Sequence, residues 1–500
     1  MSALQGIISS QRARIPKIES IVELGYDAKA ALLQSHDRAS ESDDHLARRY
    51  WSHVALGCLH RSRAVQEWAA LKDGEQKDAS FEEPVGALDL FILDDAPEGD
   101  IDDQIFRKLD EYVDAVRHAH PDIEDQSPRQ KAITTAEYLI SNNLVAIPED
   151  REYHNIEHNF LGRALFSQGK NSLPIISVII YCYVVRQLGL SAAPCGFPLH
   201  VHAVVYPPPG LDLDGNDPPS GTELPALYMD PFRSSNPVPV SSLHEQLNFL
   251  ARHLTSTSTD HNAFLSASTP REITIRCARN IVNSLQQSTE PSSGRPIDLV
   301  SARYAALWAL ILLNSSITPL RPRQHLLMLM HLFVEKFPYD ASLVEKYILP
   351  LIENPSVSDH RRTCLSVRKA DMEAPERVKP RLCNPDTWLV KFRVGQVFRH
   401  RRYGYVAVVT GWDGTCDADE EWIRRMGVDR LDGGRGQAFY HAFVQEDKSM
   451  RYVAGENIEL LPAHEVVPEA FPLEIGKWFK RWDDMDKVFV SNIRDEYPDD

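Results

Sequence analysis

One apolar stretch dominates the hydrophobic pattern of the chain. Residues 175–188 read IISVIIYCYVVRQL, in which Arg186 is the only charge. Pro174 suits the first position of a helix, and Gly189 suits the residue that follows a helix end. The length of the stretch and its polar end favour a helix over a strand. The sequence therefore predicts a helix that is buried on all sides.

The pattern changes to strand alternation shortly after this helix. His200, His202 and Val204 alternate with Val201, Ala203 and Val205, so the two histidines share one face of a predicted strand. Asp230 ends a second predicted strand, and the polar segment 207–225 between the two strands predicts an exposed loop. We expect His200, His202 and Asp230 to lie near one another.

The rest of the chain divides into a helical part and a strand-rich part. Amphipathic spacing predicts helices over 15–24, 41–71, 101–116 and 131–144, with Ser40 or Ser42 capping the second, and further helices over 240–352. Alternating apolar residues predict strands within 392–405, 406–412, 439–444 and 451–458.

Three short motifs around the apolar helix occur in the order of a known family. Leu173-Pro174-Ile175-Ile176-Ser177, Phe197-Pro198-Leu199-His200 and Asp230-Pro231-Phe232 resemble the SirB-type branch of the papain-like transglutaminase superfamily. The resemblance implies a Cys at the helix start, a His on one strand and an Asp on the next.

The expected cysteine is missing. Residues 169–180 contain no Cys, and Ser172 and Ser177 carry the only hydroxyls there. A thiolate nucleophile needs a polarised site beside a base. Either Ser177 or Cys195 replaces it, or Cys182 and Cys195 are small buried residues and His200 and Asp230 are relics or part of a binding pocket with His202. We favour the second alternative, in which the domain is not an enzyme.

The C-terminal region carries a second set of motifs. The residues VGQVFRHRRYGY (394–405), Trp412-Asp413, Glu420-Glu421-Trp422 and FYHAFV (439–444) resemble the YccV/HspQ family, also called the hemimethylated-DNA-binding domain. The resemblance implies a small SH3-like β-barrel. Its candidate binding residues are arginines and aromatics: Arg399, Arg401, Arg402, Tyr403, Tyr405, Trp412, Trp422 and Tyr440.

The two resemblances together are similar to the F-box only protein 21 type. That type implies a substrate-recognition adaptor of a cullin ubiquitin ligase, which docks on the Skp adaptor through an F-box and binds client proteins. The first residues lack an L-P-x-E-[IL] opening, so we expect an F-box to lie upstream of this chain or to be missing. Two other hypotheses stay open: a DNA-binding protein acting through the barrel, and a thiol transferase or protease of the transglutaminase clan.

The predicted fold class is α+β and multidomain, with helical N-terminal and middle regions around a degenerate papain/transglutaminase-like core and a C-terminal SH3-like barrel. The predicted segments are a helical region (1–80), the SirB-type domain (81–255), a helical, tetratricopeptide-like region (256–352), a basic linker (353–388), the YccV/HspQ-like domain (389–465) and an acidic tail (466–500).

The composition of the chain limits which kinds of partner and compartment we expect. A net charge of −17 disfavours non-specific nucleic-acid binding by the whole chain, although DNA binding through 389–465 stays possible. The seven Cys include no CxxC pair, which favours a reducing compartment and argues against a structural zinc site. No run reaches the ~18 apolar residues of a membrane span. We expect an intracellular protein, cytoplasmic or nuclear, with no cofactor, no metal and no membrane partner.

Overall fold

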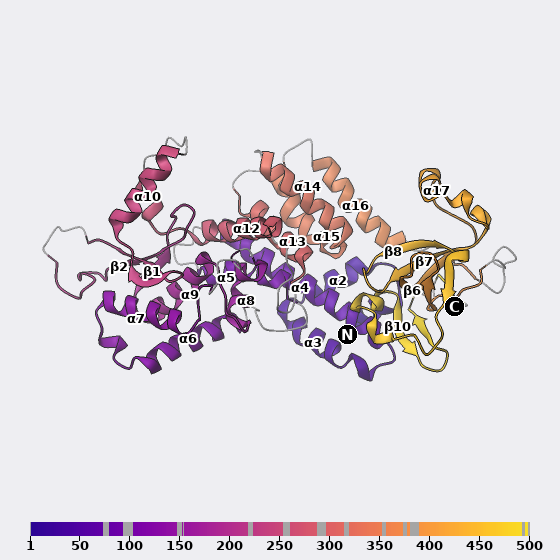
Figure 1. The fold of residues 1–500 in the computed structure, drawn as a ribbon, viewed down its shortest axis with the longest axis horizontal. Coiled ribbons are helices and arrows are strands. Elements are labelled where there is room, and N and C mark those ends of the chain that lie inside the picture. Colours follow the sequence, from indigo (N-terminus) through magenta and orange to yellow (C-terminus); the bar gives the residue numbers. More distant parts are fainter. Residues whose placement is uncertain are drawn as a thin grey trace. The chain divides into compact units, whose positions relative to one another are not determined.

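The structure is a computed structural model of the 500-residue chain. It describes residues 2–73, 80–93, 104–147, 153, 155–218, 224–253, 261–287, 297–314, 320–352, 357–373, 378–380, 390–492 and 496–498. The chain forms two compact units, one of residues 1–59, 337–345 and 357–500 and the other of residues 60–336 and 346–356. The boundary between them falls within α4 (His45–Asp73). Helices and strands occur together, which confirms the predicted α+β multidomain class (Figure 1).

The second unit holds the transglutaminase-like motifs. Besides the end of α4, its elements are α5 (Glu82–Gly86), α6 (Phe106–Ala119), α7 (Pro128–Ser141), α8 (Leu161–Phe166), α9 (Pro174–Gln187), β1 (Ser191–Pro194), β2 (Ala203–Tyr206), β3 (Leu227–Asp230), β4 (Ser234–Pro237), α10 (Val240–His253), α11 (His261–Leu265), α12 (Pro270–Gln287), α13 (Leu299–Leu312) and α14 (Leu320–Glu335).

Helix α9 is the predicted buried helix, and the prediction is confirmed. Every residue from Pro174 to Val185 is buried. The hydroxyl of Tyr181 donates to the carbonyl of Ala132 on α7 at 3.1 Å, and that of Tyr183 donates to Asp110 on α6 at 2.7 Å. The helix leads into an antiparallel sheet whose strands lie in chain order, β1-β2-β3-β4. Two helices and a sheet thus enclose a segment that has no polar face.

The first unit holds the N-terminal helices and the barrel. Besides the start of α4, its elements are α1 (Ser2–Ser9), α2 (Arg14–Val22), α3 (Lys29–Asp37), α15 (Ala341–Leu343), α16 (Val357–Glu373), β5 (Val397–His400), β6 (Val406–Asp413), α17 (Glu420–Met426), β7 (Phe439–Val444), β8 (Met450–Ala454), β9 (Ile458–Leu460), β10 (Phe479–Asp483) and β11 (Val488–Ser491).

The N-terminal helices differ from the prediction in number and bounds. Helices α1 and α3 lie within the predicted helical region 1–80, but their positions were not predicted. Helix α4 begins at His45 rather than near Glu41, and the hydroxyl of Ser42 donates to the carbonyl of Ala39 at 2.7 Å. Because the helix begins at His45, neither Ser40 nor Ser42 directly precedes it, and the predicted N-cap is wrong.

The predicted linker is wrong over residues 357–373, which form α16. Arg368 on this helix pairs with Glu19 of α2 at 2.7 Å and with Glu345 at 2.8 Å. Both carboxylate oxygens of Asp371 accept backbone N–H groups at the start of α2. The charges that resemble a solvated linker therefore make specific contacts that hold α16 against α2.

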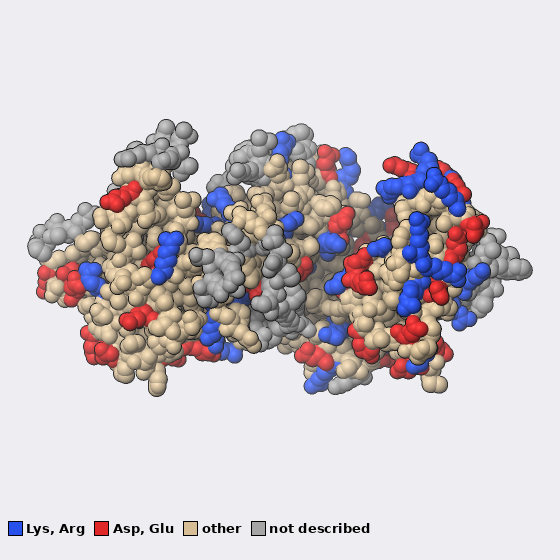
Figure 2. Space-filling view, in the orientation of Figure 1, with Lys and Arg blue, Asp and Glu red and all other residues tan. Residues whose placement is uncertain are grey.

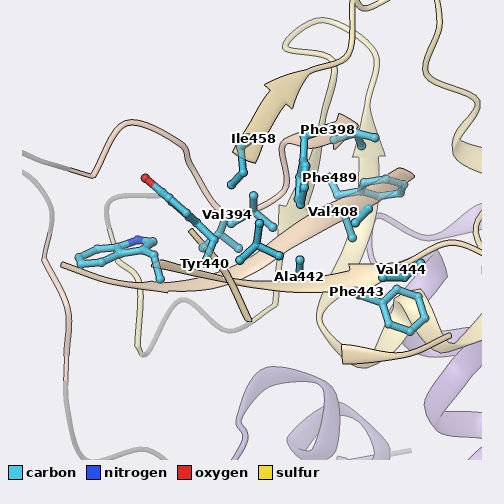
Figure 3. Packing of buried hydrophobic residues seen from close by; sticks show 14 of the residues in the cluster. Val394, Phe398, Val408, Tyr440, Ala442, Phe443, Val444, Ile458 and Phe489 are labelled. Carbon is cyan, nitrogen blue, oxygen red and sulfur yellow. The ribbon is translucent and has the colours of Figure 1, made fainter. Parts of the chain in front are cut away.

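The barrel is built on a five-stranded sheet of order β8-β7-β6-β5-β9. Its core contains Phe398, Val408, Tyr440 and Phe443, which are at most 1% exposed and are labelled in Figure 3. Strand β5 is shorter than the predicted run 392–405, because residues after His400 turn into a loop that ends at Tyr405. Strands β6 and β7 match their predicted ranges closely.

The predicted acidic tail is also wrong, because its described part belongs to the barrel. Strands β10 and β11 form an antiparallel hairpin, and Phe479 and Phe489 from it lie in the barrel core (Figure 3 labels Phe489). Tyr497 is 3% exposed, and its hydroxyl accepts the N–H of Trp412 at 3.2 Å. The aromatic side chains between the acids bury enough apolar surface to order this segment.

Gly395 allows the hairpin to close on the barrel. Its φ is +92°, its N–H donates to Val409 at 2.8 Å, and its carbonyl accepts the N–H of Phe489 at 3.0 Å. A Cβ at this position would overlap the carbonyl oxygen of Phe489, whereas a Cβ at Gly404, which also has positive φ, would meet nothing within 4 Å. Substitutions at the two glycines therefore distinguish two effects: both introduce backbone strain, but only the one at Gly395 also introduces steric overlap.

We predict that Gly395→Ala destabilises the barrel by about 3 kcal/mol or more, because strain and backbone overlap add. The matched variant Gly404→Ala should cost only ~1–2 kcal/mol, the strain of a left-handed residue. Hydrogen–deuterium exchange of β6 and β11 peptides in the full chain measures the difference. Equal exchange in the two variants would show that the Gly395–Phe489 approach is not a constraint.

Candidate functional site

The start of α9 holds a closed hydroxyl network in place of a nucleophile. Ser172 and Ser177 are fully buried, and their hydroxyl oxygens lie 2.7 Å apart. Ser177 Oγ also accepts the N–H of Ala146 at 3.1 Å and lies 3.2 Å from the carbonyl of Ser172. With its hydroxyl engaged on each side and no solvent access, Ser177 is a structural residue at the helix start.

Cys195 and Cys182 are buried thiols. Cys195 follows β1, is fully buried, and packs with Phe197, Val204 and Leu243. Burial raises the pKa of the Cys195 thiol and that of the Cys182 thiol. Because the thiolate is the reactive form, a raised pKa makes both residues poor nucleophiles. Neither thiol has the environment of a catalytic cysteine.

The structure brings the two predicted histidines and the aspartate together. His200 Nε2 lies 2.8 Å from Asp230 Oδ2, and His202 Nδ1 lies 4.0 Å from the same oxygen. The imidazole centroids are 5.0 Å apart. Asp230 ends β3, and the rings of Phe197 and Phe232 line the cluster. The predicted proximity of these three residues is confirmed.

The histidines themselves lie outside the strand. Strand β2 begins at Ala203, so the prediction that it includes His200 and His202 is wrong. Leu199 has φ +68°, and the N–H of His200 bonds to the carbonyl of Pro198 at 2.8 Å, which is a tight turn. The N–H of Cys195 bonds to the carbonyl of His202 at 2.8 Å and closes the loop. The loop, and not strand alternation, places both rings on one side.

Burial sets the protonation of His202. Its side chain is 5% exposed, and burial lowers its pKa to about 4, although the charge of Asp230 acts in the opposite direction. His200 and the guanidinium groups of Arg233 and Arg276 lower it further. His202 is therefore a neutral imidazole at neutral pH.

The end of β5 and the loop that follows it present a group of exposed residues. Arg399, Arg401, Arg402 and Tyr403 are exposed, and Tyr403 is 60% accessible. His400 is buried beneath them, and its Nδ1 accepts the N–H groups of Arg402 at 3.1 Å and Tyr403 at 3.2 Å. We call residues 399–405 the arginine–tyrosine loop. The backbone of the loop is held by His400, while its three arginines and Tyr403 face solvent.

Cationic side chains gather on this part of the molecule. Arg402 lies 5.4 Å from the ring centroid of Tyr403, and Arg451 of β8 lies 4.7 Å from that of Tyr405. Arg399 lies 3.4 Å from Glu465 in an exposed ion pair. Figure 2 shows Lys and Arg side chains over the barrel and α17 with Asp and Glu between them. The surface is therefore mixed, with a local basic group.

Two of the predicted binding aromatics are core residues, and two, Tyr405 and Trp422, are partly buried. Trp412 is 2% exposed and Tyr440 is fully buried, so neither contacts a partner. The Tyr440 hydroxyl accepts the N–H groups of Lys391 and Phe392, at 2.9 and 3.2 Å. Trp422 is half-buried against Tyr452, with centroids 5.6 Å apart. The aromatic residues at these positions pack within the domain. The motif alone does not distinguish an aromatic residue that packs in the core from one that binds a partner.

Sequence reasoning did not identify Asp413 as a central residue of the barrel. It accepts hydrogen bonds from Lys379 at 2.8 Å, His441 at 3.2 Å and Tyr452 at 2.8 Å. Burial alone would raise the pKa of Asp413, but these donors outweigh burial and hold it well below the usual range. The Trp412-Asp413 motif was the signal for this residue, since a motif carboxylate beside a buried ring often has a structural partner.

Comparison with known protein families identifies two domain classes in the chain. Residues 103–279 match the transglutaminase-like superfamily, and residues 390–486 match the family described as hemimethylated DNA-binding protein YccV like. The first segment contains the serine network and the His–Asp cluster, and the second contains the arginine–tyrosine loop. The second match extends beyond residue 465 into the segment predicted as a tail.

The chain is also homologous to individual proteins. It is 24% identical to F-box only protein 21 of Mus musculus over 397 residues, and 23% identical to that of Homo sapiens over the same length. The protein of Pongo abelii is 24% identical over 388 residues. These alignments cover 76% of this chain and 56% of each relative, so the chain spans little more than half the length of the relatives it matches. No solved structure matches the chain.

We predict that Cys195 resists alkylation in the native protein, because it is buried and its pKa is raised. Cys416, the described cysteine that is not fully buried, should react first with iodoacetamide at neutral pH. Peptide mapping by mass spectrometry reads each site, and alkylation in denaturant provides the control in which all thiols react. Rapid labelling of native Cys195, or amine transfer onto glutaminyl peptides that Cys195→Ala abolishes, would restore the thiol-transferase hypothesis.

Proposed function

We propose that this chain is a non-catalytic substrate-recognition subunit of the F-box type, which binds client proteins for ubiquitin transfer in the cytoplasm or nucleus. The observation that carries the proposal is the arginine–tyrosine loop, whose side chains are exposed on a fixed backbone. The similarity to F-box only protein 21 over 397 residues supports it. In this proposal the Skp adaptor and the cullin are partners of the complete assembly, and the client binds the barrel.

The loop has the chemistry of a protein-binding surface. Arginine and tyrosine are enriched among the residues that dominate binding energy at protein interfaces. The two N–H···His400 hydrogen bonds hold the backbone before a partner arrives. A fixed loop loses little conformational entropy on binding, which favours affinity. Arg401, Arg402 and Arg451 make the surface basic, so clients with acidic and aromatic segments fit it best.

The residues of the transglutaminase-like domain support a non-catalytic role for it. In the described part of the chain, the start of α9 offers only the buried, hydrogen-bonded Ser177, and the nearby thiols are protonated and buried. A Cys–His–Asp mechanism needs an accessible nucleophile beside its base. The domain then serves as a scaffold or a second binding surface.

We expect the double variant Arg401→Ala with Tyr403→Ala to lose client proteins, with a decrease of about tenfold or more, because two hot-spot side chains are removed. The full chain is used as bait in a cell extract, and co-purified proteins are counted by quantitative mass spectrometry. The matched control is Arg362→Ala with Leu365→Ala on α16, which removes an exposed arginine and an exposed apolar side chain from another surface of the same unit. An unchanged set of proteins on the loop variant would refute the role of the loop.

DNA binding is the second candidate function. Arg399, Arg401 and Arg402 are exposed together, and the matched family is described by hemimethylated DNA. Against it stand the net charge of −17 and the ion pair of Arg399 with Glu465. Phosphate contacts dominate the affinity of such interfaces, and a local basic group of this size provides few of them.

We therefore predict weak duplex binding by the full chain at physiological salt, measured by fluorescence anisotropy with unmethylated and hemimethylated duplexes. The full chain is required, because the barrel core extends to Tyr497. Any binding should fall steeply between 50 and 200 mM salt, with a log–log slope of roughly one per phosphate contact. Micromolar or tighter binding that Arg401→Ala with Arg402→Ala removes, and that Arg361→Ala with Arg362→Ala retains, would make DNA the first candidate.

A further inference from the structure

The His–Asp cluster contains buried polar atoms that no described group satisfies. His202 Nδ1 and Asp230 Oδ1 are both inaccessible to solvent and have no hydrogen-bond partner among the described residues. Leaving a buried donor or acceptor unpaired costs about 1–3 kcal/mol, so native proteins rarely keep two at one place. Both atoms belong to a group of three side chains whose donor atoms lie within 4.8 Å of one another. A ligand that binds this group would account for them.

The three side chains form a metal-ligand set. Two imidazole nitrogens and one carboxylate oxygen are ligands that zinc and similar transition-metal ions bind. Donors at ~2.0–2.1 Å around a tetrahedral ion lie roughly 3.4 Å apart. The distances from Asp230 Oδ2 to His200 Nε2 and His202 Nδ1, 2.8 and 4.0 Å, lie on either side of that value. The three donor atoms all lie within 4.8 Å of one another, so adjustments of the side chains alone would bring them to an ion.

We propose that His200, His202 and Asp230 form a three-ligand site for a first-row divalent transition-metal ion such as Zn²⁺, with one coordination position left for water or a partner's side chain. The ion takes the place of the hydrogen between His200 and Asp230 and engages the unpaired nitrogen of His202. The site lies in the transglutaminase-like domain, so it is independent of the proposed role of the barrel. Metal binding is a role for His200 and Asp230 that requires no nucleophile.

Two properties of the cluster limit which cations bind: the positive charges near it and the types of its ligand atoms. Arg233 and Arg276 both act electrostatically on His202, and their positive charge opposes any bound cation. Arg276 donates to the carbonyl of Phe197 at 2.7 Å, which fixes one guanidinium beside the loop. Mg²⁺ and Ca²⁺ prefer sites rich in oxygen ligands and do not gain from imidazole. The set therefore selects ions that bind nitrogen strongly.

The test is a Zn²⁺ titration of the full chain after treatment with a chelator and desalting, in competition with a chromophoric chelator. We expect one equivalent to bind and Mg²⁺ not to compete. Asp230→Asn and His202→Gln should each weaken binding by at least ~10–100-fold, since even outer-shell changes have effects of this size. His464→Gln is the matched control, because that histidine is exposed on the barrel and outside the cluster. Circular dichroism confirms that the variants are folded.

X-ray absorption of the Zn²⁺-loaded wild-type protein keeps the proposal falsifiable if the variants do not fold. Two imidazole ligands and an oxygen ligand, with no sulfur, support the site. A sulfur ligand, no stoichiometric binding by the wild type, or full binding by folded Asp230→Asn would each overturn it.

Discussion

Much of the second unit depends on the burial of one helix that has no polar face. Helix α9 has apolar or aromatic side chains on every side, so it is stable only where other elements cover it completely. Its two tyrosine hydroxyls then need acceptors inside the protein, and Ala132 of α7 and Asp110 of α6 supply them. The two strands that follow the helix, β1 and β2, flank the loop that carries His200 and His202, and the hydrogen bond from Cys195 N–H to the His202 carbonyl closes that loop.

The candidate functional groups are mostly buried in the transglutaminase-like domain and exposed to solvent in the barrel. In the transglutaminase-like domain, the hydroxyls of Ser172 and Ser177 and the imidazole of His202 are buried, where unpaired groups are costly and partners are fixed. In the barrel, the buried groups serve the fold, and the guanidinium groups of Arg401 and Arg402 stay in solvent. Recognition of large partners requires accessible side chains, and the exposed guanidinium groups of the barrel meet that requirement. In the described part of the chain, no helix is long and apolar enough to cross a membrane.

The sequence predicted the features that follow from local pattern. A continuous apolar run identified α9, and a motif placed Asp230 at the end of β3 beside His200. Features that depend on distant partners were missed. Helix α16 is held by Glu19, which lies far away in the sequence, and Phe489 and Tyr497 are buried only because the barrel is there to receive them. Composition alone made both segments resemble solvated chain, and it could not separate the core rings Trp412 and Tyr440 from exposed Tyr403.

The approach of Gly395 to Phe489 also has a consequence for folding kinetics. The first β-strand region of the barrel and its last hairpin lie far apart in the chain, with α17 and four strands between them. Contacts of high sequence separation form late, because the entropy of closing the intervening loop opposes them until other contacts exist. We therefore expect the five-stranded sheet to assemble before the hairpin docks on Gly395. In that order of events, the core side of Phe398 and Val408 would face water until the hairpin docks, and the barrel would be most prone to aggregation at that stage.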